Sequence, residues 1–268
     1  MRVRLVQFAA AEDYAANLAT VERLLGPPDD PRPDGGPRED IVVLPEAAMH
    51  DFGPPDAPLG PAAQTLDGPF VSGLTDLAKS HGATVIAGMF EISDDADRPH
   101  NTLVAIDPDG DILATYRKIH LYDSFGYRES DRMLAGPLEP VTVRLGDLTV
   151  GLLTCYDLRF PELARALVND GADVLVVPAA WLAGPLKEDH WETLLRARAI
   201  ENTAFVAAAG QCGRSYCGRS MMVDPLGVAI ASTGTDEGVV TAELSADRLA
   251  AARDRNPALH HRRLREFR

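Results

Sequence analysis

The chain has 268 residues, 46% of them hydrophobic, and carries 40 acidic against 26 basic side chains, which gives a formal charge of −14. The length suffices for one large α/β domain, and the acidic balance argues against nucleic acid as a partner because phosphate contacts need a basic face. No apolar run approaches a membrane span, and an odd count of three cysteines is typical of a reducing compartment, so we expect a cytoplasmic protein without a membrane partner.

Hydrophobic periodicity predicts strands and helices in alternation along the first half of the chain. The expected strands are 3–8, 41–44 and 84–90, and the expected helices are 12–25 and 70–81. Strands 101–106 and 112–116 flank Asp107–Gly110, whose Pro and Gly predict a tight hairpin turn. Segment 26–40 is rich in Pro, Gly and Asp, so it is expected to be a surface loop and resembles an insertion.

The second half continues the same alternation. Segment 124–136 has little periodicity and is expected to be a loop, and 245–268 is expected to be a C-terminal extension or tail. The expected strands are 173–177, 204–209 and 239–244, together with two hairpins formed by strands 141–144 and 149–154 and by strands 220–223 and 228–231. The expected helices are 161–168, 188–202 and a short one over 246–252. Hairpins interrupt the parallel pattern, so we expect mixed sheets. The order of elements favours a single domain over 1–268, built as a four-layer α-β-β-α sandwich.

Cys155 lies between an apolar strand and the helix that Pro161 opens. A side chain on such a turn is held firmly and faces the crevice beyond the strand ends, where backbone N–H groups can stabilise an oxyanion. Cys155 could therefore be a nucleophile. Most free cysteines, however, are simply small buried apolar residues, so this stretch alone leaves both the catalytic and the structural interpretation open.

Glu46 and Lys118 each follow another predicted strand, and each alone would be an ordinary charged residue. Strand ends in one α/β sheet system converge on one crevice. Glu46, Lys118 and Cys155 together therefore indicate an active site more strongly than any one of them alone. A cysteine nucleophile needs a base and an oxyanion donor, which a carboxylate and a lysine supply. We expect the ammonium to lower the pKa of the thiol. No histidine has a context that favours it as the base.

The blocks VVLPEAAM, YRKIHLYD and LLTCYDLRFPEL, which contain Glu46, Lys118 and Cys155, resemble the nitrilase superfamily of carbon–nitrogen hydrolases. Arg128-Glu129-Ser130, LLRARAIEN and SMMVDPLG extend the resemblance to about residue 244. It implies a thioester at Cys155 during amide hydrolysis, no metal or organic cofactor, and a homodimer.

The resemblance also implies a role for each site residue. Glu46 would be the general base, Lys118 would stabilise the tetrahedral intermediate with the backbone N–H of Tyr156, and Glu129 would position the lysine and the substrate. Candidate substrate-binding residues are Arg128 and Trp181. We expect Asp157, Arg159 and Glu162 to anchor the turn around Cys155, Glu201 to be a buried, paired support, and Cys212 and Cys217 not to form a zinc site.

The flanking sequences are most similar to the branch of ω-amidases and deaminated-glutathione amidases, whose substrates are small 2-oxo acids bearing an amide. The carboxylate of such a substrate calls for a cation, for which Arg128, Arg159 and Arg214 are candidates. SFGYRES after Lys118 departs from those relatives. A nitrile or N-carbamoyl amino acid hydrolase with the same triad is the alternative. A non-catalytic scaffold would need a broken triad, whereas this one is complete.

Overall fold

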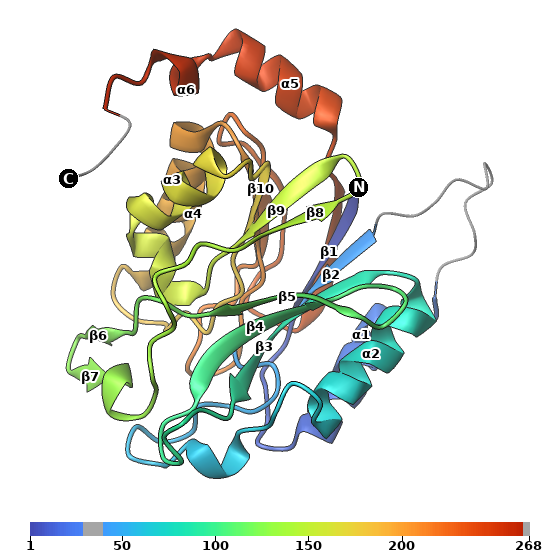
Figure 1. Cartoon of the computed structure of the whole chain (residues 1–268), viewed down its shortest axis with the longest axis vertical. Coiled ribbons are helices and arrows are strands. Elements are labelled where there is room, and N and C mark those ends of the chain that lie inside the picture. The colour runs from blue at the N-terminus through green and yellow to red at the C-terminus, as the bar shows by residue number, and fades with distance from the viewer. Residues whose placement is uncertain (29–39, 265–268) are drawn as a thin grey trace.

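A computed structural model describes residues 1–28 and 40–264, and within them two six-stranded sheets pack face to face (Figure 1). In spatial order, the first sheet contains β14 (Gly238–Glu243), β1 (Arg2–Gln7), β2 (Asp40–Val43), β3 (Thr84–Glu91), β4 (His100–Ile106) and β5 (Ile112–Arg117). The second contains β13 (Ala229–Ser232), β12 (Met221–Val223), β11 (Phe205–Ala208), β10 (Val174–Val176), β9 (Leu148–Leu152) and β8 (Thr142–Leu145). Strands β1 to β3 and β9 to β11 run parallel, while the flanking strands pair antiparallel, as expected for mixed sheets.

Helices cover the outer face of each sheet (Figure 1). Helices α1 (Tyr14–Leu25) and α2 (Pro69–His81) lie on the first sheet, and α3 (Pro161–Asn169) and α4 (Lys187–Asn202) lie on the second. Helices α5 (Ala246–Arg255) and α6 (Ala258–His261) follow the last strand. The four-layer α-β-β-α prediction is therefore confirmed.

Strand β2 shows why the central strands read as unbroken apolar runs. Ile41 and Val43 belong to the core between the sheets, whereas Val42 and Leu44 belong to the core beneath α1 and α2. Successive side chains of a strand point to opposite faces, and both faces of this sheet are covered. The apolar run therefore stops only where the strand ends, and Glu46 follows it while still buried.

The predicted loop over 124–136 is wrong in part, because β6 (Asp123–Ser124) and β7 (Tyr127–Arg128) form a small hairpin there. Phe125 and Gly126 make the turn with φ of 54° and 82°, the pair of positive values that a two-residue hairpin turn of type I′ requires. A 3₁₀ helix, Glu129–Asp131, follows. Local sequence hid the hairpin because a non-glycine residue occupies the first turn position.

Two further boundaries differ from expectation. Strand β9 stops at Leu152 instead of residue 154, and Cys155–Arg159 form a 3₁₀ helix, so Cys155 lies between the strand and α3 as expected but in a helical turn. Helix α5 runs to Arg255. Most of the expected 26–40 loop, residues 29–39, lies outside the described residues, as does the end of the tail from 265. Among the described helices, none is long and apolar enough to cross a membrane.

Gln7, at the end of β1, ties the first sheet to the loops beside β12 and β13. Its amide nitrogen donates to the carbonyl oxygens of Gly234 (2.9 Å) and Asp236 (2.7 Å). Its amide oxygen accepts from the backbone N–H and hydroxyl of Ser220, both at 2.8 Å, and from the Thr233 hydroxyl at 2.7 Å. The side chain is fully buried, so loss of the amide would orphan several buried polar groups.

We expect Gln7→Leu to lower the free energy of unfolding by at least about 2 kcal/mol, because each orphaned buried group costs about 1–3 kcal/mol. Urea denaturation measures the loss. Gln64→Leu is a matched control, since among the described residues that amide oxygen accepts only the Phe70 N–H, so its loss should cost less. A loss below about 0.5 kcal/mol for Gln7→Leu would show that the amide does not link the sheets.

Candidate active site

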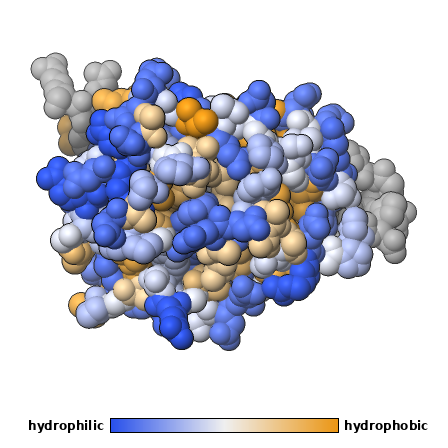
Figure 2. Space-filling view, turned by 90° about the horizontal axis from the view of Figure 1, so that it is seen from below, coloured by the Kyte–Doolittle hydropathy of each residue, from blue (hydrophilic) through white to orange (hydrophobic). Residues whose placement is uncertain are grey.

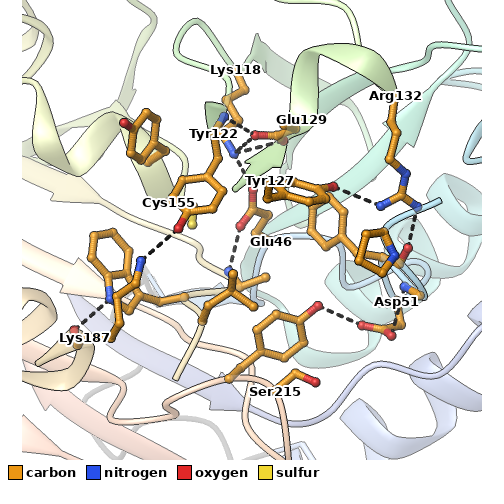
Figure 3. A pocket seen from close by; sticks show the side chains of 18 of the residues that line it. Glu46, Asp51, Lys118, Tyr122, Tyr127, Glu129, Arg132, Cys155, Lys187 and Ser215 are labelled. Carbon is orange, nitrogen blue, oxygen red and sulfur yellow. Dashed lines mark hydrogen bonds and ion pairs between the residues drawn. The ribbon is translucent and has the colours of Figure 1, made fainter. Parts of the chain in front are cut away.

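One pocket, with a cavity of about 320 Å³, gathers four of the predicted site residues: Glu46, Lys118, Glu129 and Cys155 (Figure 3). Tyr156 and Trp181 line it as well. The end of the molecule that carries β6, β7 and the long loops has apolar surface in its middle and hydrophilic residues around it (Figure 2). A mostly apolar cleft with a few convergent polar groups is the usual form of a small-molecule site.

Arg128 lies apart from this pocket. Its side chain is 68% exposed and pairs with Asp131 at 3.4 Å, and it is not among the residues that line the cavity. Its position at the end of the β6–β7 hairpin directs Glu129 inward and leaves Arg128 in solvent. The structure therefore does not support Arg128 as a substrate-binding residue.

The Lys118 ammonium is enclosed by two carboxylates. Its Nζ lies 2.9 Å from Oε1 of Glu46, and 3.0 and 2.9 Å from Oε1 and Oε2 of Glu129. All three side chains are at least 98% buried. Burial disfavours the charged ammonium, but Glu129 and Glu46 outweigh it and raise the pKa of Lys118 well above its ordinary value. Lys118 is therefore a permanent cation.

Hydrogen-bond donors from three other segments hold these carboxylates. The amide nitrogen of Asn101 donates to Glu46 (2.7 Å) and to Glu129 (3.2 Å). Backbone N–H groups of Ala180 and Tyr122 donate to Glu46 (2.7 Å) and Glu129 (2.6 Å), respectively. Sequence reasoning missed Asn101, although its place near the start of β4, antiparallel to β3, puts it at the same sheet edge as Glu46.

Close backbone approach fixes the loop that carries Glu46. A Cβ on Gly88 of β3 would lie 2.8 Å from the Cα of Glu46 and 2.6 Å from the nitrogen of Ala47. Only glycine fits such a contact. Ala47 has a φ of 54°, so the chain turns sharply away once Glu46 has been placed in the pocket.

Cys155 occupies a strained turn, with a φ of 45° in the left-handed region that non-glycine residues avoid. Its backbone N–H donates to the carbonyl of Pro178 at 2.9 Å, which fixes the turn to the segment after β10. The next residue, Tyr156, lies in the first turn of a 3₁₀ helix, where N–H groups lack acceptors within the helix. Backbone strain of this kind is concentrated at functional sites.

The thiol of Cys155 is neutral in this setting. Burial and the adjacent Glu46 carboxylate raise the pKa of Cys155 well above its ordinary value, and the lowering by Lys118 does not compensate. Lys118 lowers the pKa of the thiol, as expected, but its effect is smaller than the combined effect of burial and Glu46. A neutral thiol within hydrogen-bonding reach of Glu46 requires that base to remove its proton when it attacks.

Asp157 fixes the turn from behind, as predicted. Its carboxylate is fully buried and accepts from the backbone N–H of Thr154 (2.9 Å), the hydroxyl of Tyr116 (2.6 Å) and the N–H of His120 (3.1 Å). Each partner belongs to a segment next to Cys155 or Lys118. Asp157 therefore couples the positions of the nucleophile and the lysine.

Arg159, Glu162 and Glu201 differ from expectation. Arg159 lines the pocket, with its guanidinium carbon 4.8 Å from the centre of the Trp181 ring, so it faces the cavity instead of anchoring the turn. Glu162 is exposed in the first turn of α3. Glu201 pairs with Arg198 at 2.8 Å, but its side chain is 36% exposed, so it is a paired support that is not buried.

Other residues of the pocket had no sequence signal. Tyr216 donates to Asp51 at 3.0 Å, and Lys187 donates to the Tyr122 hydroxyl at 2.9 Å. Arg132 also lines the cavity. These residues come from segments far apart in the sequence, so only the tertiary fold brings them together.

Cys212 and Cys217 do not line the pocket. Both are buried, and burial raises their pKa values to about 11 and about 12.

Comparison with known proteins agrees with this geometry. A family model described as carbon–nitrogen hydrolase matches residues 2–254. The chain belongs to the carbon–nitrogen hydrolase family. A deaminated glutathione amidase of Escherichia coli O157:H7 is 43% identical over 226 residues, which cover 83% of this hydrolase and 84% of the relative. A human deaminated glutathione amidase is 37% identical over 75% of this chain and 65% of its own.

Solved structures show the same fold. A Xanthomonas campestris member of the superfamily, with an arsenic adduct in its active site, is 31% identical and superposes with a TM-score of 0.85 over 100% of this hydrolase and 99% of that chain. An amidase from Nesterenkonia sp. AN1 is 25% identical, with a TM-score of 0.75 over 97% and 98% of the two chains. In that structure acrylamide has added to the active-site cysteine.

The strain at Cys155 gives a testable difference between two inactive variants. We expect Cys155→Gly to unfold with a free energy about 1 kcal/mol higher than that of Cys155→Ala, because a Cβ in the left-handed region costs about 1–2 kcal/mol. Urea denaturation of both hydrolase variants measures the difference. Equal stabilities, or a more stable alanine variant, would show that the turn stores no strain at this residue.

Proposed function

We propose that this enzyme hydrolyses the amide of a small 2-oxo acid, an ω-amide or deaminated glutathione, through a thioester at Cys155. The observation that carries the proposal is the arrangement in one pocket of the Cys155 thiol, the Glu46 carboxylate and the Lys118 ammonium, which lies 2.9 Å from Glu46. A thiol of this kind reacts only if its proton is removed as it attacks. Glu46 is the group placed to take that proton.

In the proposed mechanism Glu46 accepts the thiol proton while Sγ bonds to the amide carbon, and the carbonyl oxygen becomes an oxyanion. The Lys118 ammonium and the backbone N–H of Tyr156 stabilise that charge. Glu46 then returns the proton to the amide nitrogen, the C–N bond breaks, and ammonia or an amine leaves. Water, deprotonated by Glu46, attacks the thioester, and the acid and the free thiol form.

Glu129 acts in this scheme by holding Lys118. Both of its oxygens contact the ammonium, so the lysine keeps one orientation while Glu46 gains and loses its proton. Without Glu129, protonation of Glu46 would leave the buried ammonium with no anionic partner, at a large desolvation cost.

Two features support a substrate that carries a carboxylate. Arg159 faces the cavity over Trp181, and its buried Nε has no hydrogen-bond partner within the described part of the chain. Such a donor costs free energy unless a ligand satisfies it. The relatives named deaminated glutathione amidase act on a substrate of this chemistry, which agrees with the predicted branch.

We further propose that the enzyme acts as a cytoplasmic homodimer of single-domain subunits. Ile200, Val228 and Ile230 expose apolar side chains near the end of α4 and the β12–β13 hairpin, a surface that a second copy could cover. Light scattering after gel filtration tests the dimer, and a monomeric mass at micromolar concentration would contradict it.

We expect ammonia or amine release from ω-amides of 2-oxo acids and from deaminated glutathione to exceed release from nitriles and N-carbamoyl amino acids. Glu46→Gln should lower kcat/KM by about 10²–10⁴-fold, since a positioned base contributes on that scale. Cys155→Ala should abolish turnover while the protein stays folded. Intact-protein mass spectrometry of the quenched wild-type reaction should show an acyl adduct on Cys155.

Three results would contradict the proposal. Preferential turnover of nitriles or carbamoyl compounds would favour the alternative hydrolase, and turnover of no compound would favour a scaffold. Substantial activity of folded Cys155→Ala would refute the mechanism itself.

A further inference from the structure

Lys187 is a cation in the pocket that the catalytic scheme leaves without a role. The chain has only three lysines, Lys79, Lys118 and Lys187, among 26 basic side chains. Lys118 belongs to the catalytic cluster and Lys79 is exposed on α2, whereas Lys187 begins α4 and is 91% buried against the cavity. Burial of a lysine usually requires an anionic partner.

No carboxylate partners Lys187 within residues 1–28 and 40–264, where its ammonium contacts a hydroxyl and aromatic rings. Its Nζ donates to Tyr122 Oη at 2.9 Å (Figure 3). It also lies 4.1 Å from the centre of the Phe125 ring and 5.9 Å from that of the Trp181 ring. Ring faces attract the ammonium without neutralising it. Tyr122, Phe125 and Trp181 thus form an aromatic cradle that positions the ammonium. An ammonium has three donors, so the cradle leaves donors free for a ligand.

Arg159 adds a second cation on the same pocket wall. It faces Trp181, and burial together with Arg159 lowers the pKa of Lys187. Two like charges next to one indole repel each other, and an anion between them would remove that cost. By contrast, each nitrogen of the Arg132 guanidinium already donates one hydrogen bond within the protein, to the carbonyls of Ala57 and Phe52 and to the hydroxyl of Tyr127.

We propose that Lys187 is a specificity-determining residue that, together with Arg159, binds the carboxylate on the acyl side of the substrate. Lys187 thereby selects amides of dicarboxylic acids over neutral amides of the same length. The inference rests on the proposed amidase function. The β6–β7 hairpin contributes Phe125 to the cradle, so its turn takes part in placing the charge.

The pair succinamate and butyramide tests this assignment, because the two amides have the same chain length and differ only in the terminal carboxylate. We expect the wild-type enzyme to prefer succinamate, and Lys187→Met to reduce the ratio of their kcat/KM values at least tenfold, mainly through KM. A hydrogen bond to a charged group is worth about 1.5–3 kcal/mol, which corresponds to tenfold or more. Lys187→Arg should restore most of the ratio, and Lys79→Met is the matched control on the surface.

If Lys187→Met lowers kcat/KM equally for both amides, Lys187 has a purely structural role and the proposal is overturned. If neither kcat/KM value changes, the proposal is overturned as well. Calorimetry of succinamate binding to folded Cys155→Ala separates this proposal from the amidase function, because it needs no turnover. Adding Lys187→Met to that variant should weaken binding at least tenfold, and unchanged binding would overturn the assignment. If binding shows the loss but the wild-type enzyme hydrolyses neither these amides nor those of 2-oxo acids, the amidase proposal fails while the anion site stands.

Discussion

Two carboxylates and one ammonium are buried together in one crevice, and the rest of the structure depends on how these three charged groups are kept buried. Glu46, Glu129 and Lys118 are each at least 98% buried, and together they carry one excess negative charge. Such a group is stable only when every oxygen has a donor with good geometry. Donors come from β4 of the first sheet, through Asn101, and from the segment after β10 of the second, through Ala180. The strand ends of both sheets must therefore meet at this point.

The same charge determines how the nucleophile works. Burial and then Glu46 raise the pKa of Cys155, so the resting thiol is neutral, and the carboxylate that helps to keep the proton on sulfur is also the base that must remove it. Lys118 opposes this rise in the pKa of Cys155, and its ammonium is placed to stabilise the negative charge that forms on the substrate oxygen. The left-handed turn at Cys155 and the Asp157 network behind it keep the sulfur in place while the proton moves.

Much of this could be predicted from the sequence. The apolar runs before Glu46 and Cys155 placed both residues at strand ends, and the turn signal at Asp107–Gly110 gave the hairpin that leads to Lys118. The direction of the Cys155 pKa could not be predicted, because it depends on burial and on its distance to Glu46. Arg128 was the preferred substrate-binding candidate in sequence and Arg159 was expected mainly to anchor the turn, but a short hairpin turns Arg128 toward solvent and a 3₁₀ turn directs Arg159 into the pocket. Lys187 had no signal at all, since the aromatic rings around its ammonium come from two separate segments, 122–125 and the loop that carries Trp181.

The central claim is that Glu46 holds the proton on Cys155, and the pH dependence of Cys155 alkylation tests it most directly. Peptide mass spectrometry follows iodoacetamide labelling of each cysteine, with Cys212 and Cys217, whose pKa values are raised to about 11 and about 12, as internal references. In Glu46→Gln the carboxylate no longer opposes the thiolate, while Lys118 still favours it. The midpoint of Cys155 labelling should therefore shift to lower pH even though amide hydrolysis is lost. A midpoint that stays the same or rises in Glu46→Gln would contradict the account.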